Sequence, residues 1–282
     1  MPILSSVLPA LLRALARAPW SARFGLLVVL LYAGIAVFAP WLAPHGQTQI
    51  VGAEYEPWSA AFPLGTDSIG RDMLSRLIYG ARNSAGIALI ATGLAFSLGS
   101  LAGLLAVAVG GRLDLILSRL VDLIMAVPAL IAALMVLTLT GTSILSLVLT
   151  IAVIDATRVY RLARSVGMNV MVMDYVRVAQ LRGEGLWWII RHELLPNITQ
   201  PLATEFGMRF SFVFLFISAL SFLGLGLQPP LADWGSMVRE NATLISFGDV
   251  TPLLPALAIA VLTIAVNFLV DWFQHLSSGL KD

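Results

Sequence analysis

Residues 175–197 read YVRVAQLRGEGLWWIIRHELLPN and lie between long apolar parts of the chain. The segment is rich in arginine and ends at Leu195-Pro196. A short turn would be enough to join two membrane-spanning helices, whereas this segment is long and amphipathic. We therefore expect a surface segment that contacts another protein. The alternative is an ordinary amphipathic helix whose Trp187 and Trp188 lie among lipid headgroups.

The composition is that of an integral membrane protein. Hydrophobic residues make up 59% of the 282 residues and charged residues only 12%, whereas soluble domains carry about 25% charged residues. A formal net charge of +1 leaves no dense basic surface and excludes a nucleic-acid partner. The absence of cysteine excludes disulfides and thiolate metal sites, and His45, His192 and His275 lack the spacing of metal ligands.

The charge-free runs predict six membrane-spanning helices. The run 123–154 has 32 residues, roughly 48 Å as a helix, which exceeds a hydrocarbon core of about 30 Å. We expect it to fold back at Gly141-Thr142-Ser143 and to form two spans. Pro128 should bend the first of these. The other four spans are predicted at residues 24–44, 83–111, 210–232 and 250–270.

The charge distribution predicts the orientation in the membrane. The first apolar run is about 20 residues long, which favours a retained helix over a cleaved signal peptide. Of the 17 Lys and Arg residues, only Arg71, Arg76, Arg82 and Arg239 fall on the outer side, as the positive-inside rule requires. Both termini are therefore expected in the cytoplasm. The predicted parts are a cytoplasmic segment 1–23, a first helix 24–44, an outer loop with an interfacial helix 45–82, a five-helix core 83–275 containing the cytoplasmic loop 165–200, and a tail 276–282.

Two outer segments carry most of the remaining polar residues. Residues 62–84 read FPLGTDSIGRDMLSRLIYGARNS, and residues 224–241 read GLGLQPPLADWGSMVREN. In the first, Asp67 or Ser68 can cap a helix. Arg71, Asp72 and Arg76 fall away from its apolar face, which predicts an interfacial helix before the second span. The Gly and Pro content of the second indicates a re-entrant or surface loop.

The predicted spans contain a few charged and small residues. Asp155 and Arg158 lie one turn apart, as do Glu205 and Arg209, and each set is interpreted as a structural ion pair, with a substrate ligand as the alternative. Asp122 is expected to contact a neighbouring helix or headgroups. Small residues of the second span offer places for close approach of another helix, and these are Gly93, Gly99, Ser100 and Gly103.

Three motifs occur in one order along the chain. The first contains Gly65-Thr66-Asp67 and Gly70-Arg71-Asp72. The second lies in residues 175–197, the coupling loop, and contains Ala179, Gly183 and Leu195-Pro196. The third runs from Ser221 to Gly226 and on to Trp234-Gly235. Together they resemble the "C"-type permease of ATP-binding-cassette (ABC) importers for dipeptides, oligopeptides and nickel. The resemblance implies an all-α integral membrane protein with six transmembrane helices and the type I importer permease fold.

The resemblance also implies partners and a role. A second, homologous permease, two ATP-binding subunits and an extracytoplasmic binding protein would complete an inner-membrane importer, and the ATPase would dock on the coupling loop. The family's loop usually opens with Glu-Ala-Ala, whereas this chain has Arg177, Val178 and Ala179. The positive charge of Arg177 predicts a contact with an acidic residue of the ATPase. The small Ala179 and Gly183 should let two short helices pack closely and bend. The substrate stays open among peptides, a nickel chelate, glutathione and an opine.

The sequence contains no signature of a catalytic centre. The single lysine, Lys281, does not follow a glycine-rich loop, so a Walker-type nucleotide site is excluded. We expect a non-catalytic permease without a cofactor, in which the substrate path opens alternately to each side. An ion-gradient-driven secondary transporter is the alternative, although no inverted repeat is visible. A respiratory membrane subunit would require paired intramembrane histidines.

Overall fold

The computed structural model describes residues 18–278. Most of the predicted segment 1–23 and part of the predicted tail 276–282 lie outside the described residues. The described chain is helical and contains two isolated β-bridges but no strand. Its elements are α2 (Trp20–Leu42), α3 (Met73–Val109), α4 (Gly111–Met125), α5 (Ala129–Thr140), α6 (Ile144–Met171), α7 (Asp174–Leu181), α8 (Leu186–Trp188), the π-helix η1 (Ile189–Leu194), α9 (Leu195–Phe222), α10 (Trp234–Asn241), the 3₁₀-helix η2 (Ala242–Phe247) and α11 (Leu253–Ser278).

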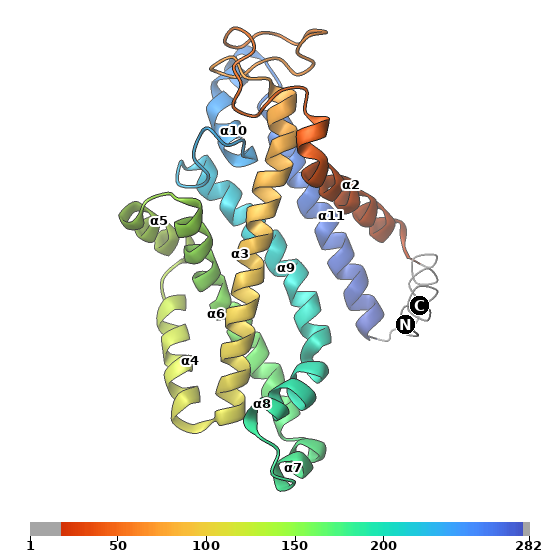
Figure 1. Cartoon of the computed structure of the whole chain (residues 1–282), viewed down its shortest axis with the longest axis vertical. Helices are drawn as coiled ribbons and strands as arrows, with labels where there is room; N and C mark the ends of the chain where they lie inside the picture. Colours follow the sequence, from red (N-terminus) through yellow and green to blue (C-terminus); the bar gives the residue numbers. More distant parts are fainter. Residues whose placement is uncertain (1–17, 279–282) are drawn as a thin grey trace.

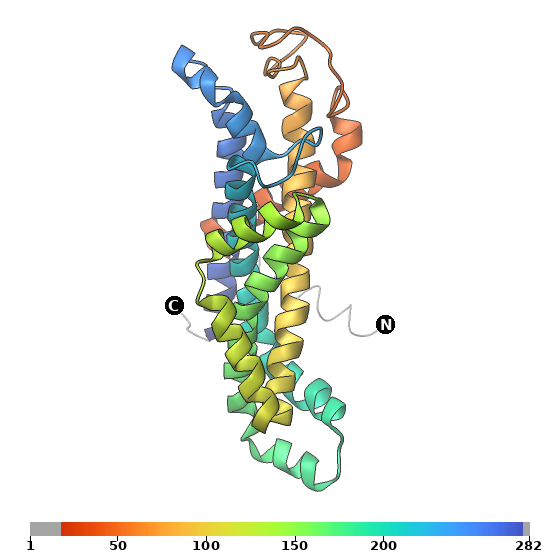
Figure 2. The ribbon, with the colours of Figure 1, turned by 90° about the vertical axis from the view of Figure 1, so that its left-hand side faces the viewer.

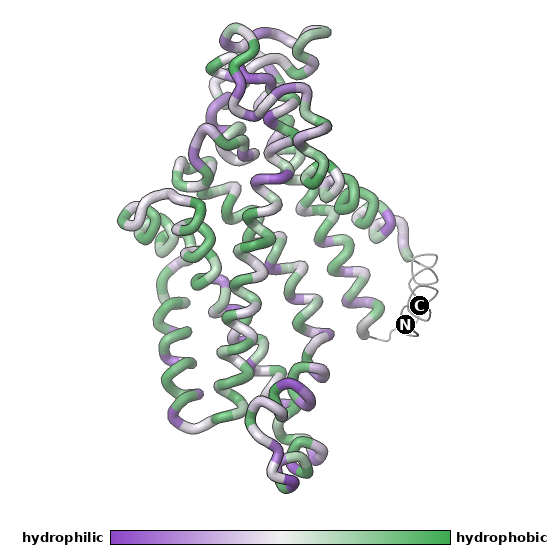
Figure 3. Tube along the Cα trace, viewed as in Figure 1, coloured by the Kyte–Doolittle hydropathy of each residue, from purple (hydrophilic) through white to green (hydrophobic). Residues whose placement is uncertain are grey.

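The long helices run along the long axis of an elongated molecule (Figure 1). Residues 43–72 and 223–252 gather at one end, and α7 and α8 lie at the opposite end in both side views (Figures 1 and 2). Polar residues concentrate toward these two ends, and the middle of the bundle is mainly apolar (Figure 3). This distribution is the one expected of a bundle that crosses a membrane with its two ends in water.

Helix α3 is longer than the sequence predicted. It begins at Met73, where Asp72 accepts a hydrogen bond from the Ser75 backbone nitrogen, and it continues without a break to Val109. The expected separate interfacial helix is therefore wrong, because its residues form the first turns of α3. Arg71, Asp72 and Arg76 are also not on a surface face, since each is at most 4% exposed.

Helices α3 and α6 approach each other closely. A Cβ atom at Gly99 would lie 2.5 Å from the Ala156 carbonyl oxygen, and one at Gly103 would lie 2.8 Å from the Tyr160 carbonyl oxygen. These two glycines therefore serve packing within the chain, whereas the space around Gly93 is open. Gly99 and Gly103 are therefore places of close helix approach, as predicted, and the helix that approaches them is α6 of the same chain.

The third predicted span is broken. Helices α4 and α5 meet at a bend of 87°, and Pro128 occupies the N-cap of α5 instead of a position inside a helix. The missing N–H of proline and the restriction it places on Val127 account for the break at this point. Helix α5 ends at Thr140 and α6 begins at Ile144, so the predicted turn at residues 141–143 is confirmed.

The last part of the chain has different helix limits from those predicted. Helices α8, η1 and α9 form one continuous helical segment from Leu186 to Phe222. The predicted span 210–232 is wrong at its end, because the helix stops at Phe222 and residues 223–233 form a loop. Helix α2 begins at Trp20 and already includes Arg23, earlier than the predicted span 24–44.

Four helical segments of the described chain are long and apolar enough to cross a membrane, and these are α2, α3, the segment 186–222 and α11. A fifth results if the bent pair α4–α5 counts as one span. Helix α6 is not among them because it carries Asp155 and the arginines at 158, 161 and 164. The six-span count therefore stays a prediction, while the all-helical membrane fold is established.

Candidate functional site

The coupling segment (residues 175–197) forms one end of the molecule. Helix α7 is amphipathic, as predicted: Val176 and Ala179 are fully buried, whereas Val178 is 51% and Leu181 88% exposed. Arg177 lies on the exposed side and has no ion pair among the described residues. Large apolar side chains in water at the tip of the molecule are unusual unless another protein covers them.

The inner side of the coupling segment is anchored in the bundle. Ile189, Ile190 and Leu194 of η1 are at most 5% exposed and belong to one apolar cluster with Leu104 of α3 and Val170 of α6. The segment therefore cannot move without displacing the ends of two long helices. A π-helical turn such as η1 is rare and occurs often at functional sites.

Gly183 ends α7 in a Schellman motif. The Glu184 nitrogen donates to the Ala179 carbonyl oxygen at 3.1 Å, and the Gly183 nitrogen donates to the Gln180 carbonyl oxygen at 3.0 Å. The φ angle of Gly183 is +80°, and no atom lies within 4 Å of a Cβ built there. The sequence reasoning expected close packing around this glycine. That reason is wrong, since the position needs glycine for its left-handed backbone.

Leu195 and Pro196 are the first residues of α9, a position at which proline is common when a helix starts from a loop. Here, however, the chain is already helical from Leu186, so the Leu-Pro pair lies inside a continuous segment. The π-helical turn that ends at Leu194 changes the hydrogen-bond pattern just before the proline. The motif therefore does not mark the boundary between a loop and a helix.

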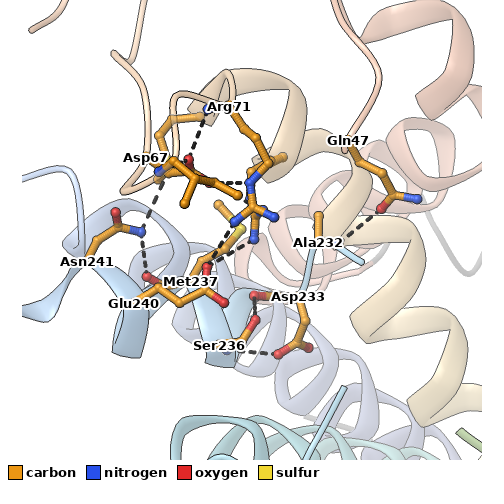
Figure 4. Close-up of polar contacts among 12 residues, drawn as sticks. Gln47, Asp67, Arg71, Ala232, Asp233, Ser236, Met237, Glu240 and Asn241 are labelled. Atoms are coloured by element: carbon orange, nitrogen blue, oxygen red, sulfur yellow. Dashed lines mark hydrogen bonds and ion pairs between the residues drawn. The ribbon is translucent and has the colours of Figure 1, made fainter. Parts of the chain in front are cut away.

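At the opposite end, four charged side chains form the outer cluster (Asp67, Arg71, Arg76 and Glu240; Figure 4 shows part of it). The Asp67 carboxylate is fully buried, and it accepts from Arg71 Nε at 2.6 Å and lies 3.3 Å from Arg76 Nη1. Glu240 lies 3.3 Å from Arg71 Nη2 and 3.2 Å from Arg76 Nη2. The cluster joins the first outer segment and the start of α3 to α10.

The first family motif builds the turn that holds Asp67. Gly70 has a φ of +79°, and a Cβ there would overlap the Gly52 carbonyl oxygen. Gly65 has a φ of +71°, and a Cβ there would overlap the Glu56 carbonyl oxygen. Thr66 Oγ1 donates to the Ala53 carbonyl oxygen at 2.7 Å. Glycine is required at both positions, so the motif fixes the loop backbone around a buried carboxylate.

Helix α10 is seated on α3 by its first residues. Asp233 caps α10 by accepting from the Ser236 nitrogen at 2.9 Å, and it also accepts from Ser84 Oγ at 2.8 Å. Trp234 is 1% exposed, and its indole Nε1 donates to the Leu77 carbonyl oxygen at 2.9 Å. A Cβ at Gly80 would overlap the Trp234 ring. The Trp-Gly motif thus binds one outer segment to the other.

Burial shifts the pKa values of two carboxyl groups at this end of the molecule. Burial raises the pKa of the Glu240 carboxyl above its usual value, although the nearby Arg71 acts in the opposite direction. Burial also raises the pKa of Asp233, against the lowering effect of its hydrogen bonds from Ser236 and Ser84. Arg71 of the outer cluster therefore favours the ionised form of the Glu240 carboxyl, which burial disfavours.

Sequence reasoning missed Glu240 and Gln47. Gln47 Oε1 accepts from the Ala232 nitrogen at 3.0 Å and from Asn83 Nδ2 at 2.9 Å, which links the loop after α2 to the loop before α10 (Figure 4). Neither residue belongs to a motif with fixed spacing. The signal that could have found Glu240 is its charge, since it is an acidic residue in an outer segment and the other outer segment carries Arg71 and Arg76.

The charged residues within the bundle form ion pairs, some within one helix and some between helices. Asp155 is 1% exposed and lies 3.7 Å from Arg158 and 3.5 Å from Arg209, and Arg209 pairs with Glu205 at 2.8 Å. Both predicted one-turn pairs are confirmed, and Arg209 joins them. Two further pairs hold α4 to α6, namely Asp122–Arg161 at 2.7 Å and Asp114–Arg164 at 2.5 Å.

Comparison with known proteins matches two family models. Residues 95–279 match the binding-protein-dependent transport system inner membrane component, and residues 17–57 match the N-terminal transmembrane domain of oligopeptide transport permease C. The chain resembles the dipeptide transport system permease protein of Haemophilus influenzae, with 34% identity over 93% of this chain and 88% of that protein. It also resembles the glutathione transport system permease protein of Pectobacterium atrosepticum, with 31% identity over 92% and 84% of the two chains.

A solved structure shows the same fold. The crystal structure of an amino acid ABC transporter with histidines aligns with a TM-score of 0.54 and 16% identity, over 72% of this chain and 94% of that one. The two family matches leave residues 58–94 uncovered, and they include the second outer segment and the coupling segment. The chain therefore belongs to the family of inner membrane components of binding-protein-dependent transport systems, a family of multi-pass ABC importer permeases.

Proposed function

We propose that this chain is one of two permease subunits of an ABC importer for peptides or a related small solute, driven by ATPase subunits that dock on residues 175–197. The observation that carries the proposal is the continuous helical segment from Leu186 to Phe222. It begins in the coupling segment and ends where Ser221 Oγ accepts from the Leu227 nitrogen of the second outer segment at 3.3 Å. Movement at the cytoplasmic end therefore reaches the outer end through one helix.

The exposed side of the coupling segment supports docking of another protein. Val178, Leu181 and Trp187 are each more than half exposed, while the opposite side of the segment is buried. Arg177 and Arg182 add positive charge to the exposed side, which suits an acidic surface on an ATPase subunit. An ion-gradient-driven transporter has no ATPase subunit that would bind such a surface.

The substrate and the remaining partners follow from the relatives. The peptide and glutathione permeases among them support a peptide or a similar solute as the cargo of this chain. An extracytoplasmic binding protein would deliver it to the end formed by residues 43–72 and 223–252, and the path would lie between this chain and a second, non-identical permease. Both termini would then lie in the cytoplasm.

The orientation can be tested by labelling. Ser59 and Gln180 are exposed at opposite ends, and the chain has no native cysteine. A Ser59→Cys variant should react with a membrane-impermeant thiol reagent once the outer barrier of the cell is permeabilised. A Gln180→Cys variant should react only after the inner membrane is opened. The reverse pattern would invert the topology and remove the docking proposal with it.

Gly183 gives a test of coupling with a matched control. Gly183→Leu places a branched side chain where φ is +80°, a conformation that costs about 1–2 kcal/mol for most residues. The Schellman turn should then open, and substrate uptake and substrate-stimulated ATP hydrolysis by the reconstituted importer should fall together. Gly183→Asn should retain most of both activities, since asparagine tolerates this conformation. Equal loss in both variants would show that side-chain volume, and not the backbone, decides this position.

A further inference from the structure

The bend between α4 and α5 borders a half-open cavity against α6. Its volume is about 150 Å³, and its lining includes Val127, Pro128 and Ala129 from the bend and Ile154, Thr157 and Arg158 from α6. Arg158 is the only charged residue that lines it. Non-helical backbone at membrane depth is tolerated where it is covered by protein or lines a polar cavity, and broken helices of this kind form substrate sites in other transporters.

The Arg158 guanidinium has unused hydrogen-bond donors. It carries five N–H groups, yet it donates no hydrogen bond to any residue that the structure describes. Its nearest carboxylate oxygen, Asp155 Oδ1, lies 3.7 Å from Nη1, which is beyond hydrogen-bond range. Nη1 is buried and without a hydrogen-bond partner. A guanidinium in this state is ready to bind an acceptor supplied by a ligand.

Two neighbours hold the guanidinium in place. The Phe212 ring centroid lies 4.4 Å from Arg158 Cζ, which fixes the group through a cation–π contact. Asp155 is engaged more closely by Arg209, at 3.5 Å, so its charge is shared between two arginines. The side chain of Arg158 remains 35% exposed. It therefore keeps a free edge of the guanidinium within reach of the cavity.

We propose that this cavity is a carboxylate subsite, in which Arg158 binds the C-terminal carboxylate of a peptide during its passage. The planar guanidinium matches a carboxylate with two parallel hydrogen bonds, and ionisable residues in membrane helices commonly mark substrate paths. The cavity has the volume of about five waters at roughly 30 Å³ each. It therefore accommodates the carboxylate end of a peptide and not a whole dipeptide. The proposal rests on the proposed transport of peptides.

The experiment uses the complete transporter in nanodiscs of zwitterionic lipid. A Val127→Cys substitution places a thiol in the cavity lining, and modification of this chain is followed by mass. The rate with an anionic methanethiosulfonate, bearing a sulfonate, is compared with the rate of its trimethylammonium analogue. Arg158→Gln should lower the anionic-to-cationic rate ratio about tenfold, because a nearby positive charge is lost. Arg161→Gln is the control, since Arg161 is already paired with Asp122 at 2.7 Å, and should leave the ratio nearly unchanged.

A second arm identifies the ligand group. Dialanine should slow the modification of Val127→Cys, whereas dialanine amide, which lacks the carboxylate, should not, and Arg158→Gln should abolish the protection. Equal protection by the amide, protection that persists in Arg158→Gln, or an unchanged rate ratio would each overturn the subsite. Failure of the importer proposal would be seen separately, as absence of ATPase binding or uptake, because the labelling reports on this chain alone.

Discussion

Replacing Arg76 with methionine should lower the free energy of unfolding by about 3–5 kcal/mol, because the change removes one of the two arginines that compensate two buried carboxylates. Arg76 is 1% exposed and lies 3.3 Å from Asp67 and 3.2 Å from Glu240. Methionine fills a similar volume but carries no charge. Arg71 would then face both carboxylates alone. The purified protein in detergent should show a clearly lower thermal midpoint.

Two further variants make this result specific. Arg82→Met is the matched control, since Arg82 is on the same helix but exposed, and it should change the free energy of unfolding by less than about 0.5 kcal/mol. Adding Glu240→Gln to Arg76→Met should recover part of the loss, because one uncompensated carboxylate is removed. If Arg76→Met and Arg82→Met behaved alike, the outer cluster would not stabilise this end of the molecule.

Replacing Leu181 with aspartate should prevent stable binding of the ATPase subunits. Leu181 is 88% exposed on α7, so the change places a charge on the proposed docking surface without disturbing a core. Loss of a central apolar contact commonly costs 2 kcal/mol or more of binding free energy, which is about thirtyfold in affinity. The measurement is co-purification of the ATPase subunits with the tagged permease in mild detergent.

The control for this variant lies at the other end of the molecule. Phe247 of η2 is 86% exposed, and Phe247→Asp should leave ATPase binding unchanged because its surface faces the opposite side of the membrane. Both variants should insert into the membrane in normal amounts. ATPase retained equally by the Leu181 and Phe247 variants would exclude α7 from the docking surface.

Much of the fold could be predicted from charge and apolar periodicity. The turn at residues 141–143, the amphipathic α7 and the intrahelical pairs Asp155–Arg158 and Glu205–Arg209 depend on local patterns, and the structure has all of them. Helix limits were less predictable. The start of α3 at Met73 contradicts the rule that charged residues lie outside a span, because Arg76 in its first turns pairs with Glu240, which is distant in the sequence.

The candidate site was predictable where a motif fixes the backbone, and not where it depends on tertiary contacts. Gly183 was singled out from its place in a family motif. The reason why glycine is needed there is the left-handed backbone of a turn in open space, and this is visible only in the backbone angles. Glu240 is separated from Arg76 by 164 positions, so no local pattern relates them. The unused donors of Arg158 could not be inferred either, because they depend on which acceptors the fold brings close.

In the proposed importer, the continuous segment from Leu186 to Phe222 would act as a lever. Its 37 residues give a length of about 55 Å at roughly 1.5 Å per residue. A tilt of about 5° about one end would therefore displace the other end by roughly 5 Å, close to one helical turn. Pro196 and Pro201 both lie inside this segment, where a missing hydrogen bond makes bending easiest. In the proposed importer, how much of a push by an ATPase reaches the outer face would then depend on the stiffness of the helix at these two prolines.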